Sequence, residues 1–230
     1  MFHNETSAKR GPPLPHKLIA SIIMTTRALL LASATLALFA PQGGGSRQTR
    51  DPLAARSKGR TDAPITLYEM SDFQCPYCRA FALGTMPLLE QEYITTGKVR
   101  LVYINLPLTS VHANAQAAAQ VALCAARQDR FWAMHDLLFR HQDQWAKLPK
   151  PAAFLLALGD SARLDHAALA RCAAAKETAA LVDADAARAR RAGAVSTPSF
   201  YVEGGLLEGA APVTVFRAVL DSIYRTKTGR

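Results

Sequence analysis

Cys75 and Cys78 are the residues best suited to chemistry, because they form a C-x-x-C sequence directly behind an apolar segment. Two thiols at this spacing, at the turn from a strand into a helix, can pass electrons by forming and breaking a disulfide bond. At a helix N-terminus, free backbone N–H groups and the helix dipole stabilise a thiolate and lower the pKa of the cysteine. We therefore predict that Cys75 is the attacking thiolate and that Cys78, nearly one turn further on, is the more buried resolving thiol.

The other two cysteines, Cys124 and Cys172, each stand alone in the sequence. Zinc sites need a second C-x-x-C pair or closely spaced histidines, so this arrangement argues against zinc. A purely structural bond between Cys75 and Cys78 is a second alternative, but a pair this close at such a turn is expected to be strained and reactive. We predict no metal site, and thiol exchange itself requires no cofactor.

The segments around the C-x-x-C pair follow the order strand, helix, strand. Residues 65–70 alternate between two faces and predict a strand, a helix is expected to run from the cysteines to about residue 83, and residues 99–106 predict a second strand. This order favours a parallel strand pair. Glu69 shares its strand face with apolar residues, so we predict a buried carboxyl with a raised pKa that exchanges protons with Cys78. The alternative is a strand-end glutamate that faces solvent.

The second half of the chain changes from helical to strand patterns. Residues 109–193 predict an all-helical block, with helical segments over 112–127, 128–145, 151–158 and 167–192. A strand over 199–203, a turn at Gly204-Gly205 and a second strand over 206–208 predict a hairpin, and residues 215–223 predict a final amphipathic helix. Pro198 precedes this hairpin, where a cis peptide bond is compatible with the sequence.

The positive charge of the chain is concentrated at its N-terminus. The 230 residues carry a formal net charge of +9. Residues 1–60 contain nine Lys and Arg against two acidic residues, a net charge of +7, whereas residues 61–230 contain 18 against 16, a net charge of +2. The part that is long enough to fold is nearly neutral, so we predict no nucleic-acid partner.

The N-terminal apolar segment is typical of an export signal. Residues 28–40 contain no charge and follow Arg27, and 13 uncharged residues are too few for a membrane span, which needs about 20. We predict a signal peptide within residues 1–40, with translation starting at Met24, and a flexible linker over 41–61. Because Leu38 is a poor fit to a cleavage site, an uncleaved membrane anchor is the alternative. Either reading places the protein in the periplasm or another extracytoplasmic, oxidising compartment.

Residues 62–226 resemble the DsbA family of thioredoxin-fold thiol–disulfide oxidoreductases, in its bacterial branch with Phe-Gln-Cys-Pro-Tyr-Cys. The matching residues are Glu69, Asp72-Phe73-Gln74-Cys75-Pro76-Tyr77-Cys78, Phe131-Trp132, His135-Asp136, Leu138-Phe139 and Thr197-Pro198-Ser199-Phe200. The resemblance implies an α/β thioredoxin fold with an inserted all-helical domain at about 109–193. It also implies that Pro198 is cis and adjoins Cys75, that Glu69 lies beneath the active site, and that Thr197, Pro198, Pro76 and Tyr77 bind the substrate.

Thr197 departs from the best-known oxidases of this family, which have Val before the cis-proline. Threonine there is similar to relatives associated with disulfide isomerisation. Isomerases of that type carry an N-terminal dimerisation domain, and residues 41–63 are too short to form one. We therefore expect a monomeric oxidase. The alternative enzymes are a disulfide isomerase and a glutaredoxin-like reductase. A non-enzymatic alternative is a copper chaperone that binds the metal through the two thiolates. The expected partners are substrate proteins with cysteines and a membrane redox protein.

Cys124 and Cys172 fall in separate helices of the predicted insert. In an oxidising compartment two neighbouring thiols would pair, and some relatives in the DsbA family have a second cysteine pair in this region. We therefore predict a structural disulfide between them. The alternative is two buried apolar thiols.

Overall fold

The structure is a computed structural model that describes residues 53–229. The predicted signal peptide or anchor over 1–40, the predicted start at Met24 and most of the predicted linker lie outside the described residues. Among residues 53–229, no helix is long and apolar enough to cross a membrane.

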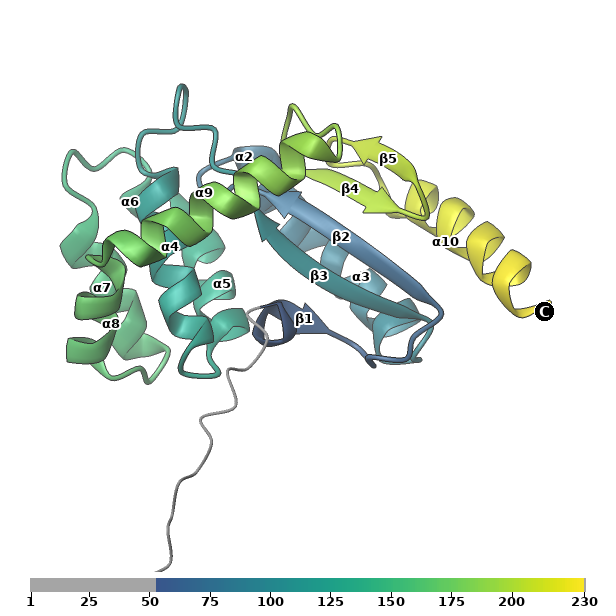
Figure 1. The fold of residues 1–230 in the computed structure, drawn as a ribbon, viewed down its shortest axis with the longest axis horizontal. Coiled ribbons are helices and arrows are strands. Elements are labelled where there is room, and N and C mark those ends of the chain that lie inside the picture. Colours follow the sequence, from purple (N-terminus) through teal and green to yellow (C-terminus); the bar gives the residue numbers. More distant parts are fainter. Residues whose placement is uncertain (1–52, 230) are drawn as a thin grey trace, which may run out of the picture. The chain divides into compact units, whose positions relative to one another are not determined.

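A five-stranded mixed sheet forms the centre of the described fold (Figure 1). Its strands are β1 (Ser57–Lys58), β2 (Ile65–Ser71), β3 (Val99–Asn105), β4 (Ser199–Val202) and β5 (Gly205–Glu208). The strand order is β1-β3-β2-β4-β5, in which β2 and β3 run parallel and every other neighbouring pair is antiparallel. The predicted parallel pair and the predicted C-terminal hairpin are therefore confirmed.

The helical segment after the C-x-x-C pair is continuous but irregular. It consists of α2 (Pro76–Ala80), a π-helical turn over Phe81–Thr85, α3 (Met86–Leu89) and a second π-helical turn over Glu90–Ile94. Pro87 has no N–H to continue the regular hydrogen-bond ladder, which accounts for a change of helical type near it. The predicted helix therefore begins where expected and extends eleven residues further, to residue 94.

Each face of the sheet has its own apolar layer. The helical segment 76–94 and α10 (Val213–Thr228) cover one face, where the rings of Phe81, Phe200 and Phe216 pack within 4.5–5.6 Å of one another. Helix α9 (Lys176–Arg191) packs over part of the other face, against Met70 and Ile104. Side chains on β2 alternate between the two layers, as a strand requires.

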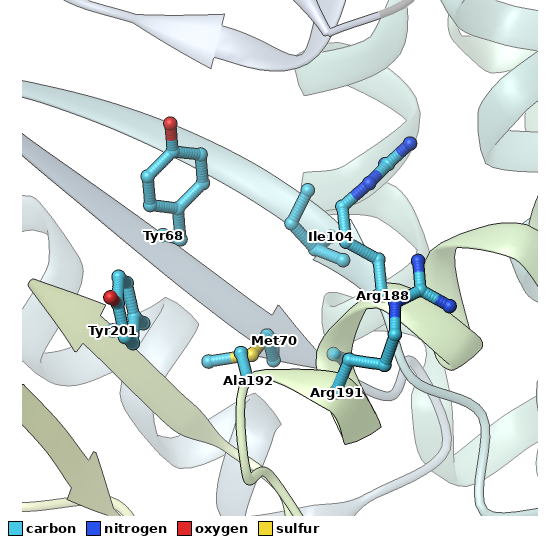
Figure 2. Close-up of a pocket in the computed structure, with 8 residues that line it drawn as sticks. Tyr68, Met70, Ile104, Arg188, Arg191, Ala192 and Tyr201 are labelled. Carbon is cyan, nitrogen blue, oxygen red and sulfur yellow. The ribbon is translucent and has the colours of Figure 1, made fainter. Parts of the chain in front are cut away.

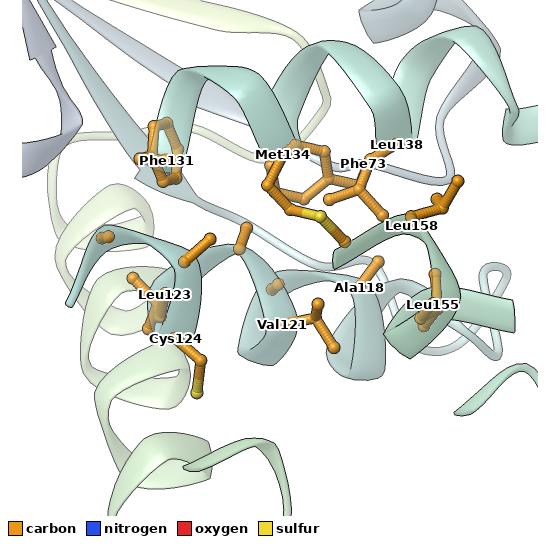
Figure 3. Packing of buried hydrophobic residues seen from close by; sticks show 14 of the residues in the cluster. Phe73, Ala118, Val121, Leu123, Cys124, Phe131, Met134, Leu138, Leu155 and Leu158 are labelled. Atoms are coloured by element: carbon orange, nitrogen blue, oxygen red, sulfur yellow. The ribbon is translucent and has the colours of Figure 1, made fainter. Parts of the chain in front are cut away.

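The insert is a block of helices, as predicted. It contains α4 (Ala115–Ala126), α5 (Phe131–Arg140), α6 (Gln142–Trp145), α7 (Ala152–Ser161), α8 (His166–Ala173) and α9. Figure 3 shows α4 beside α5, with Leu138 and Met134 directed toward the Ala-rich surface of α4. Ala118, Ala122 and Ala125 are completely buried, because small side chains allow the helices to approach closely.

The segment 167–192 differs from its prediction as one helical stretch. Helix α8 ends at Ala173 and α9 begins at Lys176, with Ala175 in an extended conformation between them. Both helices pack against α4, and the Cys124–Cys172 disulfide joins α8 to α4. The break follows from these tertiary contacts, since Ala174-Ala175 is a good helix former in isolation.

The predicted linker over 41–61 is wrong in its last part. Residues 54–56 form a short 3₁₀ turn, and β1 pairs with β3 at the edge of the sheet. Arg56 is 3% exposed and forms an ion pair with Asp185 of α9. A two-residue edge strand is held by backbone hydrogen bonds, and the partner of Arg56 lies 129 positions away, so local sequence carries little signal for either.

Candidate active site

Strand β2 and helix α2 position the two reactive cysteines. Cys75 is the N-cap residue of α2, and Pro76 occupies a first-turn position, where its missing N–H costs nothing. The backbone N–H of Cys75 donates to the Asp72 carbonyl at 3.1 Å, and the Gln74 N–H donates to the Asp72 carboxylate at 2.7 Å. This turn delivers Cys75 from the end of the strand directly to the positive end of the helix.

Several groups converge on the Cys75 sulfur. Hydrogen bonds from the Cys78 thiol and from the backbone N–H groups of Tyr77 and Cys78 lower the pKa of Cys75 to about 6, although burial acts in the opposite direction. While it is protonated, the Cys75 thiol donates a hydrogen bond to the Thr197 carbonyl oxygen, which lies 3.3 Å from the sulfur. The Thr197 side chain lowers the pKa of Cys75 further, and its buried hydroxyl makes no hydrogen bond of normal geometry within the described part of the chain.

Cys78 has the opposite environment. It is completely buried, and burial together with the neighbouring Cys75 raises the pKa of Cys78 well above its ordinary value. The backbone N–H of Asp72 donates to the Cys78 sulfur at 3.4 Å. The two thiols of the pair thus differ strongly in acidity, and only Cys75 is ionised near neutral pH.

Glu69 lies on β2, two residues before Ser71. The Glu69 side chain is completely buried, and burial raises the pKa of its carboxyl to about 8. Strand register places Glu69 beside Tyr103 of β3 and Phe200 of β4. Ser71 follows on the same face of β2, and its hydroxyl lowers the pKa of both Glu69 and Cys78. None of the three buried side-chain hydroxyl or carboxyl groups of Glu69, Ser71 and Tyr103 makes a hydrogen bond within the described residues.

The loop before β4 brings a distant segment to Cys75. The Thr197–Pro198 peptide bond is cis. The Ser199 hydroxyl donates to the Ser196 carbonyl at 2.7 Å, and the Pro198 carbonyl accepts from the Gly209 N–H at 2.7 Å. These bonds hold both ends of the loop, so that the Thr197 carbonyl faces the sulfur that lies 122 positions away in the sequence.

Asp72 organises the approach to the site, a role that the sequence analysis did not assign. Its buried carboxylate accepts hydrogen bonds at 2.8 Å from the Leu108 N–H and lies at the same distance from His112 Nδ1. The loop that follows β3 is thereby held beside the C-x-x-C turn. The only signal in the sequence was the position of Asp72 between the strand and the cysteines.

Gln142 is a second positioning residue that the sequence did not reveal. Its side-chain amide donates to the Phe73 carbonyl at 2.7 Å and to the Cys75 carbonyl at 3.0 Å. Gln142 belongs to α6, so the helical insert directly supports the backbone of the reactive turn. A buried glutamine in a helical pattern has no feature that indicates such a partner.

The structure brings Cys78 and Thr197 to Cys75, places Ser71 close enough to lower the pKa of both Glu69 and Cys78, and leaves Pro76 and Tyr77 exposed. Cys124 and Cys172 lie apart from this group, because they are joined to each other within the insert, with Cα atoms 5.8 Å apart. Among residues 53–229, no group of three or more His, Cys, Asp or Glu side chains is arranged to hold a metal ion.

Comparisons with known proteins give one family model and two kinds of relative. A family model described as thioredoxin matches residues 54–222. The chain is 31% identical over 155 residues to "Probable disulfide bond formation protein D" of Bacillus anthracis, a match that covers 66% of this chain and 70% of that protein. It is 34% identical over 174 residues to the Na(+)/H(+) antiporter NhaA 3 of Salinispora tropica, which covers 76% of this chain. The chain spans only 25% of the length of that antiporter.

The crystal structure of oxidised BdbD from Bacillus subtilis has a similar fold, with a TM-score of 0.68 at 21% identity, over 74% of this chain and 92% of that one. The prediction of a thioredoxin fold with a helical insert is confirmed. Together with the C-x-x-C geometry, these matches show that the chain belongs to the DsbA-like branch of the thioredoxin-fold thiol–disulfide oxidoreductases.

Proposed function

We propose that this protein introduces disulfide bonds into exported substrate proteins through its Cys75–Cys78 pair. The observation that carries the proposal is the difference in acidity within the pair, with the pKa of Cys75 lowered to about 6 and the pKa of Cys78 raised. Stabilising the Cys75 thiolate stabilises the reduced form of the pair, which makes the disulfide form a stronger oxidant. The same difference favours an oxidase over a reductase.

The reaction proceeds in two exchanges. A substrate thiolate attacks the Cys75 sulfur of the Cys75–Cys78 disulfide, the S–S bond of the pair breaks, and Cys78 leaves with the electron pair. A second substrate thiolate then attacks the substrate sulfur of the mixed disulfide and releases Cys75 as a thiolate. The substrate loses two electrons and gains a disulfide, and the pair gains the same two electrons.

Glu69 supplies the proton that the leaving Cys78 requires. With a pKa of about 8, the Glu69 carboxyl is largely protonated at neutral pH, whereas an ordinary glutamate would be ionised. The Ser71 hydroxyl lowers the pKa of both groups, and we assign it as a positioning residue for this transfer. In the reverse direction, when the pair is reoxidised, Glu69 accepts the proton.

The substrate binds to an apolar surface around Cys75. Tyr77, Val111 and Val195 are 67%, 70% and 79% exposed, and they come from the C-x-x-C turn, the loop after β3 and the loop before Pro198. The last two segments reach the C-x-x-C turn through the His112–Asp72 and Thr197–Cys75 contacts, and exposed apolar side chains on all three are suited to an unfolded or extended apolar segment. Thr197 and Pro198 supply backbone groups to that segment, and Pro76 and Tyr77 contact it from the other side of Cys75.

The proposed compartment is extracytoplasmic. The bond between Cys124 and Cys172 and an oxidising function both require an environment in which disulfides persist. The predicted export signal within residues 1–40 provides the route, and a membrane redox protein would reoxidise the reduced pair. We propose that the protein acts as a monomer.

The reduction potential of the Cys75–Cys78 pair tests the direction of the reaction. The pair is equilibrated with glutathione buffers, and its redox state is read by thiol alkylation and mass spectrometry. A potential nearer to about −120 mV than to about −230 mV supports the oxidase, and a more negative value supports a reductase. Cys75→Ser must abolish exchange, while Cys78→Ser must accumulate the mixed disulfide at Cys75. A Cys75→Ser protein that still exchanges thiols would contradict the proposal.

A further inference from the structure

A cavity of about 420 Å³ lies between the C-terminal end of α9 and the sheet face that α9 covers. Figure 2 shows Met70 and Ile104 behind the cavity, the rings of Tyr68 and Tyr201 on one side, and the side chains of Arg188 and Arg191 on the other. Alternation along β2 places Tyr68 and Met70 on the face opposite Glu69, so the cavity is separate from the cysteine chemistry. Its volume is within the range of small-ligand sites, about 300–1,000 Å³.

The apolar part of the cavity is suited to a flat or branched group. Met70 and Ile104 are each 2% exposed and belong to the packed layer beneath α9. Tyr68 and Tyr201 are register partners on β2 and β4, with ring centroids 6.4 Å apart and planes inclined by 55°. Tyr68 is 36% exposed, an uncommon position for a large ring in the middle of a sheet.

The charged part of the cavity has an excess of positive charge. Arg188 donates to the Asp185 carboxylate at 3.1 Å, but Asp185 is already paired with the buried Arg56, and the Arg188 side chain is 53% exposed. Arg191 forms no ion pair within the part of the chain that the structure describes. None of the described residues lining the cavity is acidic. The end of α9 presents carbonyl groups, which repel anions, so an anion here depends on the two guanidinium groups.

We propose that this cavity binds a carboxylate joined to an apolar, preferably aromatic, body. The guanidinium groups of Arg188 and Arg191 pair with the carboxylate, for which their planar donors are suited, and the body lies beside the tyrosine rings, against Met70 and Ile104. Two sources have this chemistry: the C-terminal residue of a peptide, and a small free carboxylic acid.

An NMR titration of the isotope-labelled full chain tests the site. N-acetylphenylalanine should shift the backbone signals of Tyr68, Tyr201 and Ala192, and N-acetylphenylalanine amide, which has the same body without the charge, should bind about tenfold more weakly or not at all. The two sources are then compared with two further ligands, a tripeptide that ends in phenylalanine and the free acid hydrocinnamate. Tighter binding of the tripeptide indicates a peptide C-terminus, and tighter binding of hydrocinnamate indicates a small free acid. Because the readout is binding, it is independent of whether the cysteines exchange disulfides.

Arg191→Gln is the decisive variant, since Arg191 makes no ion pair that its loss would break among the described residues. It should weaken binding about tenfold, whereas Arg190→Gln, at an exposed arginine outside the cavity lining, should change binding by less than about twofold. Thermal unfolding of both variants verifies that they are folded. Equal binding of the acid and the amide, equal losses in the two variants, or no shift at millimolar ligand would each overturn the proposal.

Discussion

At the scale of single residues, the protein controls one proton at each of three positions. Cys75 is held so that it loses its proton easily, Cys78 so that it keeps its proton, and Glu69 so that it carries a proton at neutral pH. The causes differ: hydrogen bonds act on Cys75, whereas burial dominates at Cys78 and Glu69. Substitutions that change these pKa values therefore test the proposed chemistry.

Thr197→Val removes a hydroxyl that lowers the pKa of Cys75 but keeps the backbone carbonyl beside the sulfur. We expect the pKa of Cys75, about 6 in the natural chain, to rise by about 1, because hydrogen bonds to a charged group contribute about 1.5–3 kcal/mol and part of this is replaced by the remaining donors. The pair should become less oxidising. The measurement is the rate of thiol alkylation as a function of pH.

Thr226→Val is a matched control, because this threonine is exposed on α10 and its hydroxyl donates to the Ser222 carbonyl one turn away. It should leave the alkylation profile unchanged. If Thr197→Val also left it unchanged, the hydroxyl would have no part in stabilising the thiolate.

Glu69→Gln tests the buried acid through the pH dependence of stability. The pKa of Glu69 is raised from 4.5 to about 8 on folding, so the folded protein binds the extra proton between these values. The stability that this proton contributes is fully present below pH 4.5 and is lost as the pH rises through about 8. The natural chain should therefore lose on the order of 4 kcal/mol more than the variant across this range.

Urea unfolding at a series of pH values measures this difference. Glu208→Gln serves as the control, because Glu208 is exposed on β5, and it should reproduce the pH dependence of the natural chain. A parallel pH dependence in Glu69→Gln would show that the carboxyl is not held in its protonated form.

At the scale of elements, the sheet and the insert support each other through buried polar contacts. Gln142 of α6 holds the carbonyl groups of the reactive turn, and Asp185 of α9 accepts from the Asn105 side chain at the end of β3 at 2.8 Å. The same Asp185 pairs with Arg56, which precedes the edge strand β1. Because of these contacts, the 3₁₀ turn over residues 54–56 and strand β1 belong to the folded domain and not to a linker.

Arg56→Ala should destabilise the protein by about 3 kcal/mol, because it leaves a buried carboxylate with fewer charged partners. Arg60→Ala is the matched control, because the Arg60–Asp62 pair lies in solvent, with side chains 69% and 66% exposed, and its loss should hardly change stability. Urea unfolding gives both values. Similar effects of the two substitutions would mean that β1 and Arg56 do not contribute to the folded core.

At the scale of the whole molecule, the two cysteine pairs have separate tasks. One pair lies at the end of the sheet beside the cis-proline loop, and the other joins α4 to α8 inside the insert. The second bond closes a segment of 48 positions, which restricts the unfolded chain.

A Cys124→Ala, Cys172→Ala double variant should therefore lose about 3–4 kcal/mol of unfolding free energy. The alkylation profile of Cys75 should stay unchanged, because the insert disulfide does not contact the reactive sulfurs. Thermal unfolding and alkylation measure the two properties. A double variant that kept full stability but lost exchange would reverse the assignment of the two pairs.

The elements were predictable where local pattern decides them. Alternation along residues 65–70 identified the strand and the face of Glu69, and the helical periodicity of residues 109–193 identified the insert. The break between α8 and α9 and the pairing of β1 with β3 were missed, since each depends on packing against elements elsewhere in the chain.

By itself the sequence determined the candidate reactive pair and its position at the N-terminus of a helix, because a C-x-x-C after a strand and before a helix indicates thiol exchange through local geometry. The alternating pattern of the strand also predicted that the Glu69 side chain is buried on the same face as its apolar neighbours. Only the tertiary structure decided which groups meet the Cys75 sulfur, how Asp72 and Gln142 hold the turn, and where the cavity beneath α9 opens. These contacts join residues from 36 to 122 positions apart, and side-chain packing, which local periodicity does not encode, selects them.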